Sequence, residues 1–155
     1  MKRQVIVFGL VSSILILLSF SCGRKTYSTA KVNYLSDKEG TITARAIGVG
    51  NNEAEAYTNA IFNVFDVLFF RGLPESNQKV ALIGTNENEE RSKNTNYFDE
   101  FYNERYETFV MSVVPSGDLM KSAGGKKSIA VDIKINLDAL RTDLEENNII
   151  RKFGY

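Results

Sequence analysis

The fold is predicted best from residues 41–74, "TITARAIGVGNNEAEAYTNAIFNVFDVLFFRGLP". The spacing of the hydrophobic residues in this stretch changes just after Gly50. Residues 41–50 are rich in threonine and isoleucine and contain two closely spaced glycines, which predicts a strand. Beyond them the apolar side chains recur at helical spacing, at Tyr57, Ile61, Val64 and Leu68. The stretch therefore predicts a strand followed directly by a long helix.

Both ends of this helix carry sequence signals. Asn51 or Asn52 can cap its first turn, Gly72 can provide a left-handed exit, and Pro74 prevents continuation. Its apolar face is unusually broad, so we expect it to lie across a sheet as the central core helix. Polar residues argue against a membrane span by interrupting the apolar run, at Asn59, Asn63 and Asp66.

The turn "GVGNNE", residues 48–53, joins a strand to a helix N-terminus and has the form of a phosphate cradle. The third glycine of a dinucleotide fingerprint is replaced by Glu53, and Glu55 adds a second negative charge. Both carboxylates would repel a phosphate. We therefore interpret the glycines as a tight strand-to-helix connection.

Downstream, residues 128–137 alternate cleanly between apolar and polar side chains, which predicts a strand with one wet face. A second strand is expected at residues 108–114, and a final helix over residues 137–149 with Asn136 as its cap. Other elements are less marked: a short helix at the start of residues 97–109, a small strand at 80–83, a mobile excursion over 84–96 and a glycine-bearing connection over 115–126.

This order of elements predicts an α+β fold. The expected architecture is a small antiparallel sheet of about three strands, with the long core helix and a C-terminal helix packed on one face. The sequence divides into three parts: a signal peptide at residues 1–21, a flexible tether at 22–40 and a single α+β domain at 41–155.

The N-terminus has the form of a bacterial lipoprotein signal. Lys2 and Arg3 precede an apolar run of signal-peptide length, and the small residue Ser21 stands directly before Cys22, the only cysteine of the 155 residues. An ordinary signal peptide or an uncleaved anchor with a chance cysteine is the alternative. An exported cysteine without a disulfide partner would be an oxidisable thiol, so we interpret Cys22 as the lipid attachment point.

The residue after Cys22 indicates the membrane to which the lipoprotein is sorted. Gly23 stands where an aspartate would resemble an inner-membrane retention signal. We therefore expect an outer-membrane protein that is lipid-anchored and faces the periplasm. Its expected partners are the membrane, through the N-terminal lipid, and another protein of the envelope.

Composition excludes several functions. The chain has no histidine, and its single cysteine is assigned to lipidation, so the common metal, haem and Ser-His or Cys-His sites lack their residues. We predict no cofactor, no metal and no catalytic residue. Removing the signal with its two basic residues leaves 17 Lys plus Arg against 19 Asp plus Glu, a formal charge of −2 that argues against a nucleic-acid partner.

Residues 97–109, "YFDEFYNERYETF", hold six aromatic side chains and four carboxylates, of which three fall on the proposed helix. The aromatics either pack inward or line a groove for a glycan, lipid or peptide. The carboxylates, Asp99, Glu100 and Glu104, either face water or form an acid/base cluster. Exposed apolar residues in the later connection add a candidate contact. The candidate ligand or partner contacts are Tyr97, Phe101, Tyr102, Leu119 and Met120.

Two segments carry a family resemblance, "TARAIGVGNNEAEAYTNAIFNVF" at residues 43–65 and "KKSIAVDIKINLDAL" at 126–140. The chain resembles small envelope lipoproteins and the N-terminal modules of some flagellar-associated periplasmic proteins, in which a strand ending in A-x-G-x-G leads into an alanine-rich helix with a hairpin beside it. The resemblance implies a non-enzymatic envelope component and transfers no site residue except Cys22. We expect an assembly or accessory subunit, or alternatively a ligand-binding lipoprotein.

Overall fold

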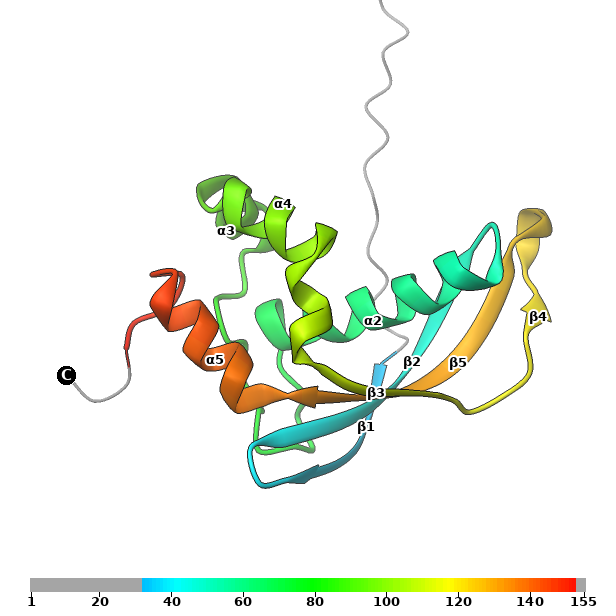
Figure 1. The fold of residues 1–155 in the computed structure, drawn as a ribbon, viewed down its shortest axis with the longest axis horizontal. Helices are drawn as coiled ribbons and strands as arrows, with labels where there is room; N and C mark the ends of the chain where they lie inside the picture. Colours follow the sequence, from blue (N-terminus) through cyan, green and yellow to red (C-terminus); the bar gives the residue numbers. More distant parts are fainter. Residues whose placement is uncertain (1–31, 153–155) are drawn as a thin grey trace, which may run out of the picture.

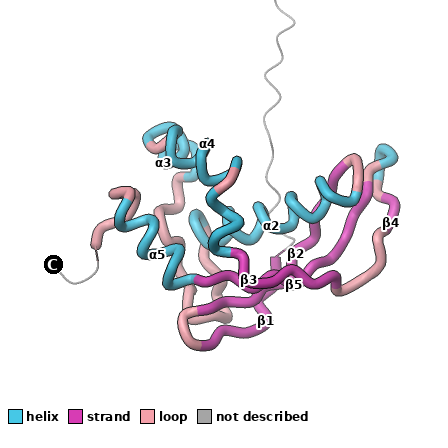
Figure 2. The backbone as a smooth tube through the Cα atoms, viewed as in Figure 1, coloured by secondary structure: helices cyan, strands magenta, loops and turns pink. Residues whose placement is uncertain are grey.

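The computed structural model describes residues 32–152 and shows an α+β fold, as the sequence predicted (Figure 1). Its antiparallel sheet has five strands instead of about three, in the order β1-β2-β5-β3, with β4 also paired to β5. The strands are β1 (Val32–Lys38), β2 (Thr41–Gly50), β3 (Val110–Pro115), β4 (Met120–Lys121) and β5 (Lys127–Asn136). All helices lie on one side of this sheet (Figure 2).

β2 and β5 form the centre of the sheet, and both were predicted from their sequence patterns. They pair antiparallel over their full length, from Thr41 opposite Asn136 to Gly50 opposite Lys127. Beyond Ile42, which pairs with Ile135, the residues that face the helices are small on β2 and large on β5: Ala44, Ala46 and Gly48 opposite Ile133, Val131 and Ile129. The small side chains of β2 leave room for a helix to pack closely.

That helix is α2 (Glu53–Phe70), which lies across the sheet as predicted. The side chain of Asn52 caps it by accepting a hydrogen bond from the Glu55 amide at 2.9 Å. Gly48 explains the close approach of strand and helix, because a Cβ placed there would lie 1.8 Å from the Ala56 carbonyl oxygen. This contact confirms the structural interpretation of the glycines at the turn.

The other helices complete the helical layer. They are α3 (Glu87–Lys93), α4 (Thr95–Asn103) and α5 (Leu137–Glu146), together with the 3-10 turn η3 (Arg105–Phe109). A second 3-10 turn, η4 (Ala123–Gly125), lies instead in the connection between β4 and β5 and has no buried residue. The core between this layer and the sheet is rich in aromatic rings, notably Phe65, Phe69, Phe70, Phe98, Phe101 and Phe109. No helix within residues 32–152 is both long and apolar enough to cross a membrane.

Three predictions about local structure are wrong. Residues 32–38, assigned to the tether, form β1 because they pair with β2 and place Val32 and Tyr34 against the core. The excursion at 84–96 contains α3, which Asn86 caps. Residues 80–83 form no strand, since the Leu82 and Ile83 amides donate to carbonyls in the last turn of α2. In addition, β4 was not anticipated.

Candidate functional site

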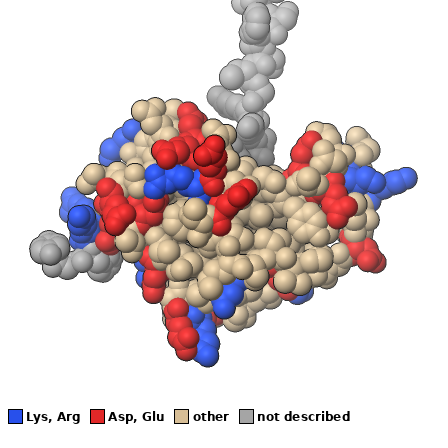
Figure 3. Space-filling model, in the orientation of Figure 1, with Lys and Arg blue, Asp and Glu red and all other residues tan. Residues whose placement is uncertain are grey.

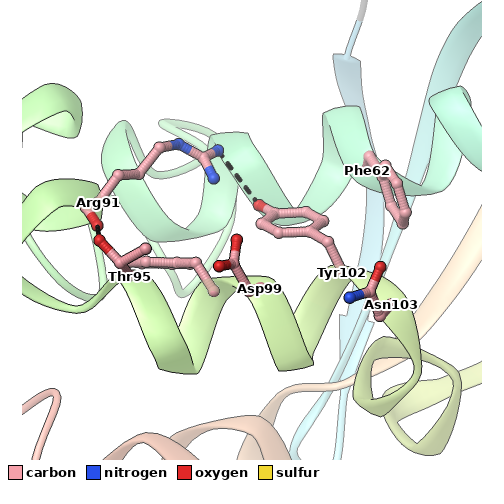
Figure 4. A pocket seen from close by; sticks show the side chains of 7 residues that line it. Phe62, Arg91, Thr95, Asp99, Tyr102 and Asn103 are labelled. Carbon is pink, nitrogen blue, oxygen red and sulfur yellow. Dashed lines mark hydrogen bonds between the residues drawn. The ribbon is translucent and has the colours of Figure 1, made fainter.

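A pocket of about 430 Å³ lies at the contact of α2 with α3 and α4, and we call it the α2–α4 pocket. Its lining consists of Phe62, Arg91, Thr95, Phe98, Asp99, Tyr102 and Asn103. Figure 4 shows Arg91 and Thr95 at one end, Phe62 and Asn103 at the other, and Asp99 and Tyr102 between them. Five of the lining residues share one face of α4, because helical spacing brings residues three and four apart together.

Aromatic rings shape the pocket wall. Tyr102 meets Phe62 edge-on, with ring centroids 4.8 Å apart, and lies nearly parallel to Phe98 with centroids 6.4 Å apart. Phe62 also meets Tyr106 edge-on at 5.0 Å. Edge-to-face pairs of this kind are favourable and hold the rings in fixed orientations.

Arg91 joins α3 to α2 and α4. Its Nη2 donates to Asp66 Oδ1 at 2.6 Å and to the Tyr102 hydroxyl at 3.3 Å, and its Nε donates to Glu87 Oε1 at 3.0 Å. The guanidinium carbon also lies 4.9 Å from the centroid of the Phe70 ring. Similar distances separate it from the rings of Phe98 and Tyr102, so the cation is bound by both carboxylates and aromatic faces.

Asp66 is the buried member of this group and is only 2% exposed. The Tyr102 hydroxyl donates to the same Oδ1 that accepts from Arg91, whereas Oδ2 is buried and accepts no hydrogen bond from any residue in the described range. Burial raises the pKa of Asp66, although the hydrogen bond from Tyr102 and the charge of Arg91 oppose it. We call Asp66, Glu87, Arg91 and Tyr102 the Asp66 cluster.

Tyr102 is held in its protonated form by the same surroundings. Burial first, and then the negative charge of Asp66, raise its pKa well above the ordinary value. A phenol in this state donates hydrogen bonds and does not act as a base at neutral pH. The cluster is thus arranged for binding and positioning, with its hydroxyl and guanidinium both directed at one carboxylate.

The charges around the pocket do not cancel. Asp66, Glu87 and Asp99 are acidic and Arg91 alone is basic among these four, which gives a formal sum of −2. Figure 3 shows acidic side chains gathered over the helical part of the same view, with basic groups among them. An anionic ligand would therefore meet repulsion in this pocket.

The residues named from the sequence lie in different surroundings. Tyr97 and Phe101 belong to the core, at 7% and 0% exposure, and Phe101 has no free surface with which to meet a ligand. Tyr102 forms part of the pocket wall. Leu119 and Met120 are exposed near β4 and do not line the α2–α4 pocket. The proposed lipidation site, Cys22, lies outside the described residues.

Tyr97 has a structural partner instead. Its hydroxyl donates to Asp143 Oδ2 on α5 at 2.8 Å, and Arg105 forms an ion pair with the other oxygen of Asp143. Burial, together with the hydrogen bond to Asp143, raises the pKa of Tyr97. This group ties α4 and η3 to α5, so part of the aromatic segment serves packing.

Asp99, Glu100 and Glu104 are exposed, and of these three only Asp99 lines the pocket. Sequence reasoning missed Asp66, Arg91 and Phe62, which come from two other elements. One signal was available: a single aspartate inside an otherwise apolar helix requires a compensating partner when that face is buried. Asp66 was instead considered only as an interruption of a membrane span.

The opposite face of the sheet, turned away from the helices, is the second candidate site, and we call it the outer sheet face. In one row across it lie Val114, Asp132 and Arg45, which the register places opposite one another. Ile47 belongs to the same face and is 37% exposed, and Val114 is 54% exposed. Arg45 binds Asp132 through two hydrogen bonds, of 2.6 and 2.9 Å, which lower the pKa of Asp132.

Further apolar side chains flank this face. Leu35 on β1 and Met111 on β3 are exposed where the strand register is irregular. The outer sheet face therefore presents Ile47 on β2 and Val114 on β3 on either side of the β5 strand, which contributes Asp132 to the central ion pair. Within residues 32–152 no group of three or more acidic or sulfur ligands is arranged to hold a metal ion.

Comparisons with protein-family models, with curated proteins and with solved structures find no match for this chain. The class that the structure defines is an α+β domain with one helix-covered and one open sheet face. Function is accordingly argued from the pocket and the outer sheet face.

Proposed function

We propose that this protein is a non-catalytic lipoprotein of the bacterial outer membrane that acts as an assembly or accessory subunit. In this proposal a lipid on Cys22 anchors the chain on the periplasmic side. The domain then contacts another envelope protein through the outer sheet face. The N-terminal sequence and the open face of the sheet support the two halves of the proposal separately.

The observation that carries the contact is the exposure of large apolar side chains on a sheet face that no described element covers. Ile47 and Val114 lie on this face, and Leu35 and Met111 stand beside it. Large apolar side chains exposed on one face of a small domain support a protein contact there. Two apolar sheet faces, or a sheet and a helix, bury such groups when they pack together.

The central ion pair is compatible with burial under a partner. Arg45 and Asp132 satisfy each other through two parallel hydrogen bonds, so covering them leaves neither charge alone. A partner would therefore meet Ile47 and Val114 beside a neutral ion pair, with Thr43 and Lys134 in the neighbouring row of the same face. The centre of this face is closer to the core of a protein interface, which is depleted in unpaired charge, than to an ordinary solvated surface.

The anchor places this face near the membrane. Nine residues lie between Cys22 and the first residue of β1, Val32, and the ten Cα–Cα steps from one to the other span at most about 35 Å. The domain would thus stay within one domain diameter of the lipid surface. This favours a partner that is itself in or on the outer membrane.

Mild crosslinking in intact cells tests the proposal, followed by detergent extraction through a C-terminal tag and identification of the recovered proteins. We expect one companion in near-equal amount, and its loss in Cys22→Ala, which lacks the attachment point. Recovery of the tagged protein alone from both samples contradicts the assembly role.

The α2–α4 pocket supports a second candidate function, a ligand-binding lipoprotein. The observation that favours it is an aromatic-walled cavity of about 430 Å³ with polar groups converging on it, a size in the range of small-molecule sites. A thermal-shift screen of the full-length protein against soluble glycan, amine and peptide fragments tests it. A flat response across the set would remove this alternative.

A further inference from the structure

We infer that the α2–α4 pocket selects ligands that carry a primary ammonium group, with Asp99 as its counter-charge and the rings of Phe62 and Tyr102 as its walls. This inference rests on the ligand-binding alternative and names the class of ligand. It does not depend on the assembly role of the outer sheet face.

Asp99 supplies a carboxylate that has no partner among the described residues. Its carboxylate lines the pocket between Arg91 and Tyr102, and it makes no hydrogen bond or ion pair with any residue from 32 to 152 (Figure 4). A carboxylate without a partner on an aromatic wall is an acceptor available to a ligand. The strongest partner for it is a charged nitrogen donor.

The basic group of the pocket is already engaged. Arg91 donates to Asp66 and Glu87 and lies against three aromatic rings, so its charge is neutralised by the protein. An anionic ligand would have to compete with two carboxylates for this guanidinium. A cation meets the formal charge of −2 that the four surrounding groups leave.

The aromatic rings of the pocket wall provide a surface that suits a cation. The faces of aromatic rings attract cations, and an aromatic wall combined with a carboxylate suits an alkylammonium group. Arg91 already lies over the Tyr102 ring, with its guanidinium carbon 5.0 Å from the centroid, so the half-buried Phe62 offers the ring face for the ligand. Phe62 and Tyr102 hold one another edge-on at 4.8 Å and come from α2 and α4, so the wall is fixed by packing and not by the ligand. The buried Oδ2 of Asp66, which has no donor among the described residues, adds to the negative potential behind this wall.

Isothermal titration of the full-length protein in nonionic detergent tests the inference with a matched pair of probes. Cadaverine and 1,5-pentanediol have the same carbon chain and differ in having ammonium or hydroxyl ends. We expect cadaverine to bind and the diol to bind at least about tenfold more weakly, because a hydrogen bond between two charged groups is lost. Maltose serves as a neutral glycan probe.

Two variants locate the site. Asp99→Asn should weaken cadaverine binding by about tenfold while leaving the melting temperature of the unliganded protein unchanged, since this side chain is exposed. Phe62→Leu, a substitution on α2, should weaken cadaverine binding by about threefold, because the face of the ring is lost. Glu104→Gln is the matched control: it removes an exposed carboxylate at the end of α4 that does not line the pocket, and should bind as the parent does.

Equal binding of cadaverine and the diol, or equal effects of Asp99→Asn and Glu104→Gln, would overturn the inference. Binding of maltose alone would also overturn it, while keeping the ligand-binding alternative. Absence of binding by all three probes would remove the inference together with the support for that alternative. The assembly role is tested separately, by the crosslinking experiment.

Discussion

At the scale of single residues, the Asp66 cluster shows how a charge is kept inside a hydrophobic layer. Asp66 lies on α2 among phenylalanines and is compensated by Arg91, which belongs to a helix some 20 residues later in the chain. A buried ion pair adds little net stability, but removing one partner leaves an uncompensated charge. The position of α3 therefore depends on this pair.

Arg91→Leu should lower the free energy of unfolding by about 3 kcal/mol, because it leaves Asp66 buried without its cation. Urea denaturation followed by circular dichroism measures the change. Arg71→Leu is the matched control: Arg71 is exposed and pairs with Glu87 at 3.4 Å, so its loss should cost about 0.5 kcal/mol. Equal costs for the two substitutions would contradict this account.

The raised pKa of Asp66 gives its contribution to stability a definite pH dependence. In the unfolded chain an aspartate has a pKa of about 3.9. Between that value and the higher pKa of the folded state, the native protein holds more protons than the unfolded one, so stability falls as pH rises. Relative to Asp66→Asn, the parent protein should therefore lose stability as pH rises through this window. Urea titrations of both proteins from pH 3 to 7 would show it, and a relative gain would refute it.

At the scale of elements, the close packing of α2 on β2 is set by small residues. Gly48 faces the backbone of α2, and Ala44, Ala46, Ala56 and Ala60 surround the contact without any exposed surface. A side chain larger than these would push the helix from the sheet. The turn glycines are therefore a requirement of packing in the structure, as the sequence suggested.

Gly48→Ala should lower the free energy of unfolding by about 3 kcal/mol, because its Cβ would lie 1.8 Å from a backbone oxygen that cannot move independently. Thermal and urea denaturation both report it. Gly117→Ala is the control, since a Cβ there meets nothing within 4 Å. A neutral Gly48→Ala would show that the helix can shift without loss.

Elements with a regular pattern were predictable and the others were not. β2, α2, β5 and α5 carry clear periodicity and are confirmed close to the expected bounds. β1 has only isolated apolar residues, and it becomes a strand by pairing with the free edge of β2. The helix α3 contains no buried residue, so no hydrophobic pattern in the sequence predicts it.

At the scale of the whole molecule, the domain has two unlike faces. Helices cover one side of the sheet (Figure 1). The aromatic core lies beneath them and the α2–α4 pocket lies between them, while the other side of the sheet carries Ile47, Val114 and the Arg45–Asp132 ion pair. The proposed membrane anchor would hold both faces near a lipid surface. The two faces allow the two candidate functions to be tested independently.

Substitution of the outer sheet face should remove the companion without unfolding the domain. Val114→Lys places a charge on a side chain that is already 54% exposed, so we expect native stability and loss of the crosslinked partner. Val80→Lys makes the same change at another exposed valine, outside the sheet, and should retain the partner. Retention in both variants would assign the contact elsewhere.

The proposed anchor predicts the distribution of the protein between cell fractions. The parent chain should be recovered with the outer membrane and should require detergent for release, because a covalent lipid holds it there. Cys22→Ser should appear in the soluble periplasmic fraction or remain as an uncleaved precursor. A Cys22→Ser protein that matches the parent in both fraction and apparent mass would rule out lipidation at this position.

The sequence alone predicts the α+β class, the strand-to-helix turn at Gly48 and the long helix. These features depend on the spacing of hydrophobic residues and on backbone geometry within one segment. The tertiary structure alone decided the pairing of β1, the partner of Asp66 and the residues of the α2–α4 pocket. Each of these joins segments that are distant in the chain. Hydrogen bonds between strands, ion pairs and ring contacts form only after the core has brought such segments together, so no local pattern records them.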